Sequence, residues 1–284
     1  IIYSYGKDIQ DPAMQKFGVY LAKRQKWGDV TPGGKIDEQL MQLMLLDEIK
    51  NAPAENALIS DFWLPDTEIA GGRDKAGSTK GFFFAAKGGH NNESHNHNDL
   101  GTCVLYYDGK PCLIDIGREQ YVAKTFSSRR YEIWTMQSQY HNLPKINDQK
   151  EGGQFKAKNT SFKSDSKKVV FSTDIAGAYV LETGIDKWIR RYQLDRGRKF
   201  VVSDEYQFRE LKTDPTTLNF VTYCSVRRVS DGVLNLEGED FKLEMIYNTK
   251  KVSPEIEFYE VDDPMLKRYW PKGITRIVFT LNDP

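Results

Sequence analysis

The chain has 284 residues, of which 39% are hydrophobic, 28% charged and 12% aromatic. This is the profile of an ordinary globular protein with one large or two smaller domains, and no apolar run is long enough to span a membrane. Its 40 basic and 40 acidic residues cancel, which argues against a global field that attracts nucleic acid or a membrane surface. Attraction for a charged substrate therefore has to be local.

Two helices are expected in the first part of the chain. The first covers 11–28, opens with Asp11-Pro12 and shows apolar residues at helical spacing. The second covers 36–52 and carries an apolar stripe, made of Leu40, Leu43, Met44 and Ile49. Two helices alone cannot enclose a core, so both have to pack on other parts of a protein. The sequence NAPAEN at 51–56 is the expected linker.

From about Ala57 the pattern changes to short β-branched or aromatic runs, separated by Gly, Asp and Asn. Such a series predicts an antiparallel β-sandwich. The runs cover 81–89, 102–109, 110–117, 167–174, 199–208, 233–238, 241–248 and 275–282. We therefore expect a helical segment over 1–56 and a β-sandwich domain over 57–284.

One hairpin can be placed in register. Asp108-Gly109 suits a two-residue turn between the runs 102–109 and 110–117. The expected pairs are Tyr107 with Lys110, Leu105 with Cys112, and Thr102 with Asp115. This register returns Asp115 to the stretch that precedes the first strand. It does not place Cys103 opposite Cys112, and we expect no disulfide.

Three of the four histidines lie in the stretch GGHNNESHNHNDLG at 88–101. If His95 and His97 lie on a strand, their rings share one face. With Asp115, a carboxylate in an apolar run, and the remaining histidine, His141, residue His97 would complete a two-histidine, one-carboxylate set. This set suits Zn²⁺ with one position left open. In the alternative reading the histidines are surface or hydrogen-bonding loop residues, and Asp115 simply ends a strand.

A longer string is more specific. SHNHND at 94–99, the Asp108-Gly109 turn, the strand with Asp115, RRY at 129–131 and YHNLPKIN at 140–147 follow in order. Together they resemble the heparinase II/III-like polysaccharide lyases, over roughly Phe62 to Trp270. The resemblance implies an N-terminal α/α toroid joined to C-terminal antiparallel β-sheet layers. The segment 1–56 is then expected to be the end of a toroid whose bulk is missing.

The resemblance also implies roles for single residues. His97, Asp115 and His141 match the zinc ligands, and the zinc is expected to brace the active-site loop. His95 matches the histidine at the substrate, and Glu93 is a second catalytic candidate in the same loop. The substrate-binding candidates are His90, Asn96, Tyr121, Arg129 and Arg130. The toroid's catalytic tyrosine has no match in 1–56, which puts activity of the isolated chain in question.

The implied function is cleavage of a uronate-containing anionic polysaccharide by β-elimination. Basic residues around the loop could offset the charge of the polymer, namely Lys87, Arg118, Lys124, Arg129, Arg130 and Lys145. The expected cofactor is Zn²⁺, the expected location periplasmic or secreted, and no nucleic acid or membrane span is expected. The oligomeric state stays open, a homodimer included. Two alternatives remain: a zinc-dependent glycan hydrolase or deacetylase, and a non-catalytic carbohydrate-binding β-module.

Overall fold

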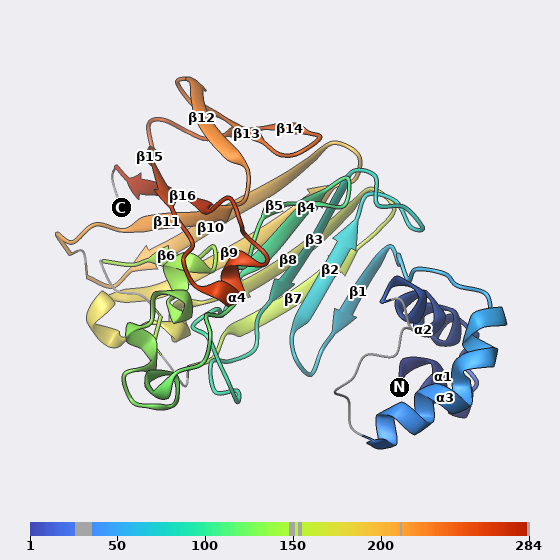
Figure 1. Cartoon of the computed structure of the whole chain (residues 1–284). Coiled ribbons are helices and arrows are strands. Elements are labelled where there is room, and N and C mark those ends of the chain that lie inside the picture. The colour runs from blue at the N-terminus through green and yellow to red at the C-terminus, as the bar shows by residue number, and fades with distance from the viewer. Residues whose placement is uncertain (26–35, 148–150, 153–154, 211, 283–284) are drawn as a thin grey trace. The chain divides into compact units, whose positions relative to one another are not determined.

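The computed structural model describes residues 1–25, 36–147, 151–152, 155–210 and 212–282. The chain forms two compact units, Ile1–Ile59 and Ser60–Pro284, whose elements are labelled in Figure 1. The boundary expected after residue 56 falls just before this division. The origin of the first unit in a toroid stays a prediction.

The first unit consists of the helices α1 (Ile2–Asp8), α2 (Pro12–Arg24) and α3 (Ile36–Asn51). The Asp11 carboxylate accepts hydrogen bonds from the backbone N–H groups of Ala13 and Met14, so it caps α2, and Pro12 suits the first helical position. Helix α1 was not expected. The end expected for α2, at Gly28, lies outside the described residues.

The core of the first unit is small. Val19, Ala22 and Ile49 are buried together. Of the predicted stripe on α3, only Ile49 belongs to this core. The other three side chains are exposed by more than half: Leu40, Leu43 and Met44. Burial by three short helices is therefore incomplete, as expected for helices that need a further packing partner.

The second unit is built on a nine-stranded antiparallel sheet with the order β1-β2-β3-β4-β5-β11-β16-β15, in which β6 also pairs with β11. Its strands are β1 (Asp61–Leu64), β2 (Ile69–Arg73), β3 (Phe82–Lys87), β4 (Cys103–Tyr107), β5 (Lys110–Leu113), β6 (Pro144–Lys145), β11 (Thr217–Thr222), β15 (Val252–Tyr259) and β16 (Ile274–Leu281). The hairpin β4–β5 therefore lies inside the sheet, with pairing partners on both sides.

A second antiparallel sheet, in the order β10-β9-β8-β7, packs against the first. Its strands are β7 (Lys158–Ser164), β8 (Lys168–Asp174), β9 (Ile185–Asp195) and β10 (Lys199–Phe208). A third, three-stranded sheet contains β12 (Ser225–Ser230), β13 (Val233–Glu237) and β14 (Lys242–Ile246). One apolar core joins all three, with Phe84 of the first, Phe171 of the second and Leu234 of the third buried together. The predicted fold class, antiparallel β-sandwich layers after short helices, is confirmed.

The register of the hairpin was predicted only in part. Tyr107 pairs with Lys110 as expected, but Leu105 pairs with Leu113 and not with Cys112, because the register shifts next to Tyr106. The irregularity puts one extra residue in β5. Strand β5 then ends at Leu113, and the pairs described for these strands do not include Thr102 with Asp115. Asp115 still returns to the expected region, in irregular chain beyond the strand.

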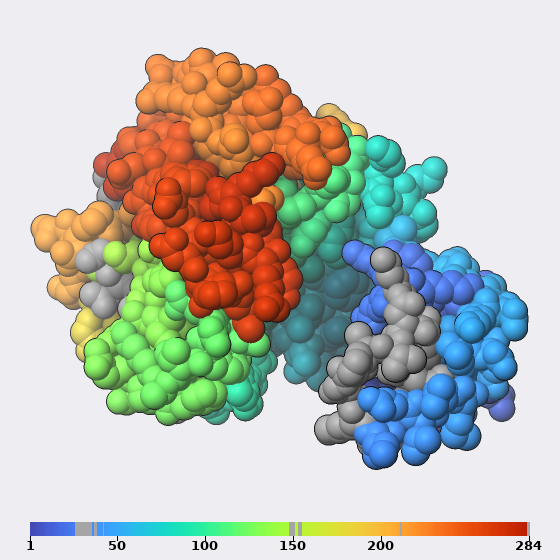
Figure 2. Space-filling view, viewed as in Figure 1, coloured from blue at the N-terminus to red at the C-terminus, as the bar shows by residue number. Residues whose placement is uncertain are grey.

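The segment that follows Asp115 is compact but not regular. It contains the 3₁₀ turns η1 (Ala123–Phe126), η2 (Arg130–Glu132), η3 (Trp134–Met136) and η4 (Ser138–Tyr140). This segment, green in Figure 2, lies against the red C-terminal region with helix α4 (Pro264–Lys267). The Trp270 indole N–H donates to the Ile116 carbonyl at 3.0 Å, which links the two regions. None of the described helices is long and apolar enough to cross a membrane.

Candidate active site

The candidate site is built on the loop 88–101 between β3 and β4, which we call the histidine loop. Its ends are closed by backbone hydrogen bonds: Gly101 N–H donates to Lys87 O at 2.9 Å and Lys87 N–H to Thr102 O at 3.1 Å. The Glu68 carboxylate accepts from Gly89 N–H at 2.7 Å. The loop therefore leaves and re-enters the sheet at a fixed place. His95 and His97 lie in irregular chain, so the strand geometry that would put their rings on one face does not apply.

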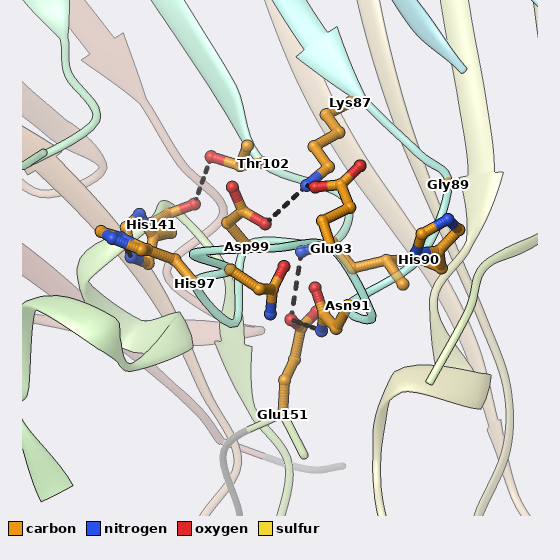
Figure 3. A network of polar contacts seen from close by, with 12 residues as sticks. Lys87, Gly89, His90, Asn91, Glu93, His97, Asp99, Thr102, His141 and Glu151 are labelled. Atoms are coloured by element: carbon orange, nitrogen blue, oxygen red, sulfur yellow. Dashed lines mark hydrogen bonds and ion pairs between the residues drawn. The ribbon is translucent and has the colours of Figure 1, made fainter. Parts of the chain in front are cut away.

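A buried carboxylate ties the two ends of the loop together. Glu151 Oε2 accepts from the Asn91 side-chain amide at 3.0 Å and from Leu100 N–H at 3.1 Å, as Figure 3 shows. The Glu151 carbonyl accepts from the Asn98 amide at 2.6 Å. The side chain is 1% exposed, and this burial raises its pKa to about 8, against the hydrogen bond from Asn91 and with the help of the Asp99 charge.

Glu151 was not predicted from the sequence. It stands in the polar stretch QKEGGQ, which has the composition of a surface loop. Burial and a partner far away in the sequence give it its role, and neither leaves a mark on a single sequence. Glu151 is thus a further residue of the site. It holds the histidine loop in place but lies outside that loop.

A lysine organises the acidic residues of the loop. Lys87 Nζ lies 2.9 Å from a carboxylate oxygen of Glu93 and 2.9 Å from one of Asp99 (Figure 3). Glu93, a catalytic candidate from the sequence, is therefore engaged in an ion pair with its side chain about half exposed. In this arrangement Glu93 acts on the conformation of the loop through Lys87.

His95 is exposed, and its backbone adopts the left-handed conformation with φ 60°. This conformation is unfavourable for a residue with a side chain, so the surroundings have to hold it in place. The His95 ring stacks on Tyr121 at 5.6 Å between centroids and meets the edge of Phe126 at 6.0 Å. Tyr121 was a predicted substrate-binding residue. Phe126, which is 67% exposed, was not predicted to be part of the site.

His97 faces the interior, towards His141. His97 Nδ1 lies 3.2 Å from His141 Nε2, and the opposite nitrogen of His141, Nδ1, lies 2.8 Å from Asp115 Oδ2. His141 Nε2 also lies 2.9 Å from the Thr135 carbonyl oxygen. The three residues predicted as metal ligands are therefore brought together in a chain of contacts that runs through the His141 ring.

This arrangement shifts the pKa values of all three residues. Burial disfavours a charge on His141, but the Asp115 carboxylate outweighs it and raises the pKa of His141 to about 9. In return, His141 overcomes the effect of burial on Asp115 and lowers the pKa of that carboxyl to about 2. Burial and the charge of His141 lower the pKa of His97 to about 4. At neutral pH without a metal, the set thus holds an Asp115–His141 ion pair beside a neutral His97.

Whether these residues suit zinc can be judged from their donor atoms. Two imidazole nitrogens on one tetrahedral Zn²⁺ are separated by about 3.3 Å, from Zn–N bonds of 2.0–2.1 Å. The His97 and His141 nitrogens are 3.2 Å apart, which fits. Asp115 lies behind the His141 ring, at its other nitrogen, where a carboxylate commonly supports a metal-bound histidine. In the part of the chain that the structure describes, no three acidic, histidine or cysteine side chains converge on one point.

The predicted substrate-binding residues have different surroundings. Arg130 Nε donates to Asn96 O at 2.9 Å and its Nη1 to Thr125 O at 2.8 Å, so Arg130 holds the loop backbone between the two histidines. Arg129 pairs with Glu132 at the surface, 2.8 Å away. Asn96 is buried, and its amide donates to the Tyr131 hydroxyl at 3.3 Å.

His90 is exposed and lies on the side of the loop away from His97 and His141 in Figure 3. Its Nδ1 accepts from the backbone N–H of Asn92 at 3.1 Å. The histidine loop therefore presents two imidazoles outwards, His90 and His95, and one inwards, His97.

Solved structures share this fold. A mutant of the heparan sulfate lyase HepC from Pedobacter heparinus matches with a TM-score of 0.65 and 14% identity, over 87% of this chain and 39% of that one. A heparinase III gene product matches with a TM-score of 0.63 and 12% identity, over the same shares. A further heparinase III matches with a TM-score of 0.55 and 16% identity, over 75% and 32%. The chain thus spans about two fifths of the length of the first two lyases.

Comparison with curated proteins gave no match. The family model of the heparinase II/III-like C-terminal domain, however, matches residues 63–238, which include the histidine loop, Asp115, His141 and Glu151. The sequence motifs, the sandwich and this match agree, and the chain belongs to the heparinase II/III-like family.

Proposed function

We propose that this chain forms the β-sheet part of a polysaccharide lyase that cleaves uronate-containing anionic glycans by β-elimination, in the periplasm or outside the cell. The observation that carries the proposal is the presentation of His95. It is exposed in a strained backbone conformation, beside the rings of Tyr121 and Phe126, on a loop tied down by buried Glu151. Membership in the heparinase II/III-like family supports the reaction class.

The chemistry requires three things at a uronate. The carboxylate next to C5 is neutralised, a base removes the C5 proton, and the electron pair forms the C4–C5 double bond as the C4–O4 bond breaks and O4 takes up a proton. An imidazole can remove a proton or donate a hydrogen bond to the carboxylate near neutral pH. We assign one of these two roles to His95. The proton for O4 is expected from the toroid, for whose tyrosine residues 1–56 hold no match.

Glu93, His97 and His141 contribute to this site by holding the histidine loop in position. Lys87 joins Glu93 to Asp99, so the loop on both sides of His95 is held by one ammonium group. Arg130 fixes the carbonyl of Asn96, the residue after His95. Side chains that are fixed in advance in this way reduce the free energy needed to reach the reactive geometry.

We propose further that Zn²⁺ is held by His97 and His141, with Asp115 as third ligand or as the carboxylate that orients His141. The 3.2 Å separation of the two imidazole nitrogens supports the first part, and the contact of Asp115 with the opposite nitrogen supports the second. When bound, the metal would supply a rigid brace between the loop and the segment that carries His141. The position of His95 itself is set by side chains of this chain.

The lyase proposal is tested on the complete product of the gene, with a panel of uronate polymers and absorbance of the unsaturated uronate as readout. We expect product from at least one polymer and a loss of at least 100-fold in kcat for His95→Ala, in the range of a lost acid–base residue. Lys163→Ala, which changes an exposed residue of β7 outside the histidine loop, is the control and should keep native activity. Hydrolysis or deacetylation without unsaturated product would refute the lyase and favour a zinc hydrolase.

The zinc proposal is tested by elemental analysis of protein purified without added metal. We expect near-stoichiometric zinc in the native protein and in His90→Ala, and its loss in His97→Ala. Metal-free native protein with unchanged stability would show that the inner histidines form only a hydrogen-bonded pair.

A further inference from the structure

The positive charge expected to meet an anionic polymer is largely occupied within the protein. Lys87 pairs with Glu93 and Asp99, and both Arg129 and Lys124 pair with Glu132. Arg130 donates to backbone carbonyl groups. Cations that are already paired contribute little to binding an external anion. Cations without an acidic partner are therefore the stronger candidates for binding an anionic ligand.

Such cations lie on the far side of the histidine loop, in a cavity of about 440 Å³ that we call the His90 pocket. It is lined by His90, Asn92, Phe155, Lys156, Lys158 and Gly177. None of these residues is acidic. In the described part of the chain, neither Lys156 nor Lys158 has an ion-pair partner, and both are exposed.

The backbone fixes the polar groups of this pocket. The start of the histidine loop and the segment before β7 form an antiparallel bridge in which His90 is opposite Lys156. Asn91 N–H donates to Phe155 O at 2.7 Å, and Ala157 N–H donates to Gly89 O at 2.8 Å. Opposite residues in such a bridge have their Cβ atoms about 4.5–5.5 Å apart.

Strand alternation adds a second lysine to the same face. Lys158 follows Lys156 by two residues, at the first position of β7, so both side chains point to one side. His90 Nδ1 accepts from Asn92 N–H at 3.1 Å, which leaves Nε2 as the N–H donor of the neutral ring. Two ammonium groups and an imidazole N–H therefore line one side of the cavity.

Gly177 packs closely against the segment that carries the two lysines. A Cβ atom at this position would come within 2.7 Å of Lys156 O, so no larger residue fits without movement of the backbone. Phe155, which is 36% exposed, adds an apolar surface of the kind on which sugar rings pack. Space, apolar surface and N–H donors together suit one charged sugar residue.

We propose that the His90 pocket is a glycan subsite, which binds a carboxylate or sulfate group of the polymer at Lys156 and Lys158. The proposal rests on the proposed function, because it takes the ligand to be the same anionic glycan. The proposal gives the two histidines of one loop different tasks. His95 contacts the sugar residue that reacts, and His90 helps to hold another sugar residue of the polysaccharide.

The test is isothermal titration calorimetry of the full chain with three tetrasaccharides. The first is a sulfated heparan sulfate tetrasaccharide, the second is unsulfated N-acetylheparosan, which carries carboxylates only, and the third is neutral tetra-N-acetylchitotetraose. The variant is K156A/K158A. The control is K163A/K167A, which removes two exposed lysines of β7 and the following turn that do not line the pocket.

We expect the chain to bind the anionic ligands and not the neutral one, with about tenfold weaker binding and a flatter salt dependence in K156A/K158A. The control should stay within twofold of the native chain. A loss limited to the sulfated ligand identifies sulfate as the bound group, and an equal loss with both identifies the carboxylate. No binding of the anionic ligands, native affinity in K156A/K158A, or an equal loss in the control would each overturn the proposal.

The two proposals fail separately. Lysine-dependent binding without any unsaturated product from the complete gene product would support the subsite and refute the lyase. Unsaturated product together with binding that does not depend on these lysines would refute the subsite alone.

Discussion

Glu151 makes a specific prediction about stability and pH. Replacing it by glutamine keeps a carbonyl oxygen to accept from Asn91 and Leu100 but removes the ionisable group. The native carboxyl has a pKa raised to about 8 from 4.5, because the ionised form is buried. Between these two values the folded state binds more protons than the unfolded one, so the free energy of unfolding falls as pH rises.

The size of the effect follows from the shift. At about 1.4 kcal/mol per pKa unit, a displacement from 4.5 to about 8 corresponds to at most about 5 kcal/mol, of which about 3–4 kcal/mol is lost between pH 5 and pH 8. Exposure of 1% leaves little screening by solvent to reduce it. Glu151→Gln should therefore be close to the native protein in stability at pH 5 and clearly more stable at pH 8.

The assay is urea unfolding followed by tryptophan fluorescence at several pH values between 5 and 8. Glu182→Gln, which removes an exposed carboxylate, serves as the control and should follow the native curve. Parallel pH profiles for the native protein and Glu151→Gln would show that the pKa of the buried carboxyl is not raised in the folded state, and would refute the reasoning.

Two further predictions concern the support of the site. Arg190 is fully buried and pairs with Asp204, whose side chain is 6% exposed, so Asp204→Ala should destabilise the protein by about 3–5 kcal/mol, seen as a lower Tm. Glu205→Ala, which breaks an exposed pair, should leave the Tm almost unchanged. The backbone of Asn142 has φ 61°, and its side chain forms hydrogen bonds with three buried backbone groups. Asn142→Gly should therefore lower the free energy of unfolding in urea by about 3 kcal/mol or more. Native stability of Asn142→Gly would show that only the positive φ matters at this position and that the side-chain hydrogen bonds add no stability.

The sequence allowed the fold class and several strands to be predicted because both depend on local patterns. The run 199–208 coincides with β10, since alternation and β-branched residues directly mark a half-buried strand. The hairpin was correct at its turn, where Asp108-Gly109 fixes the geometry, and wrong beyond it. An irregularity in one strand changes the register of every later pair, and the sequence KPCLID carries no sign of it.

The candidate site shows the same division. The clustering of histidines and the family motif indicated His95, His97 and His141, and the structure brings the last two within 3.2 Å. The opposite exposure of His95 and His97 was not predictable from their spacing, because it depends on a left-handed residue in irregular chain. Glu151 and the pair of lysines at 156 and 158 were missed because only tertiary contacts give them a role.

The tie between Glu151 and the histidine loop also bears on the order of folding. The contacts of Glu151 with Asn91 and Leu100 join residues 60 and 51 positions apart, across the whole irregular segment with its 3₁₀ turns. Closing so long a loop costs entropy before the contacts repay it, so such links form late. We therefore expect local hairpins such as β4–β5 to form before this tie, and His95 to reach its strained conformation only after it. During synthesis, a nascent chain that ends before residue 151 would carry every histidine of the site but not yet the arrangement that makes them a site.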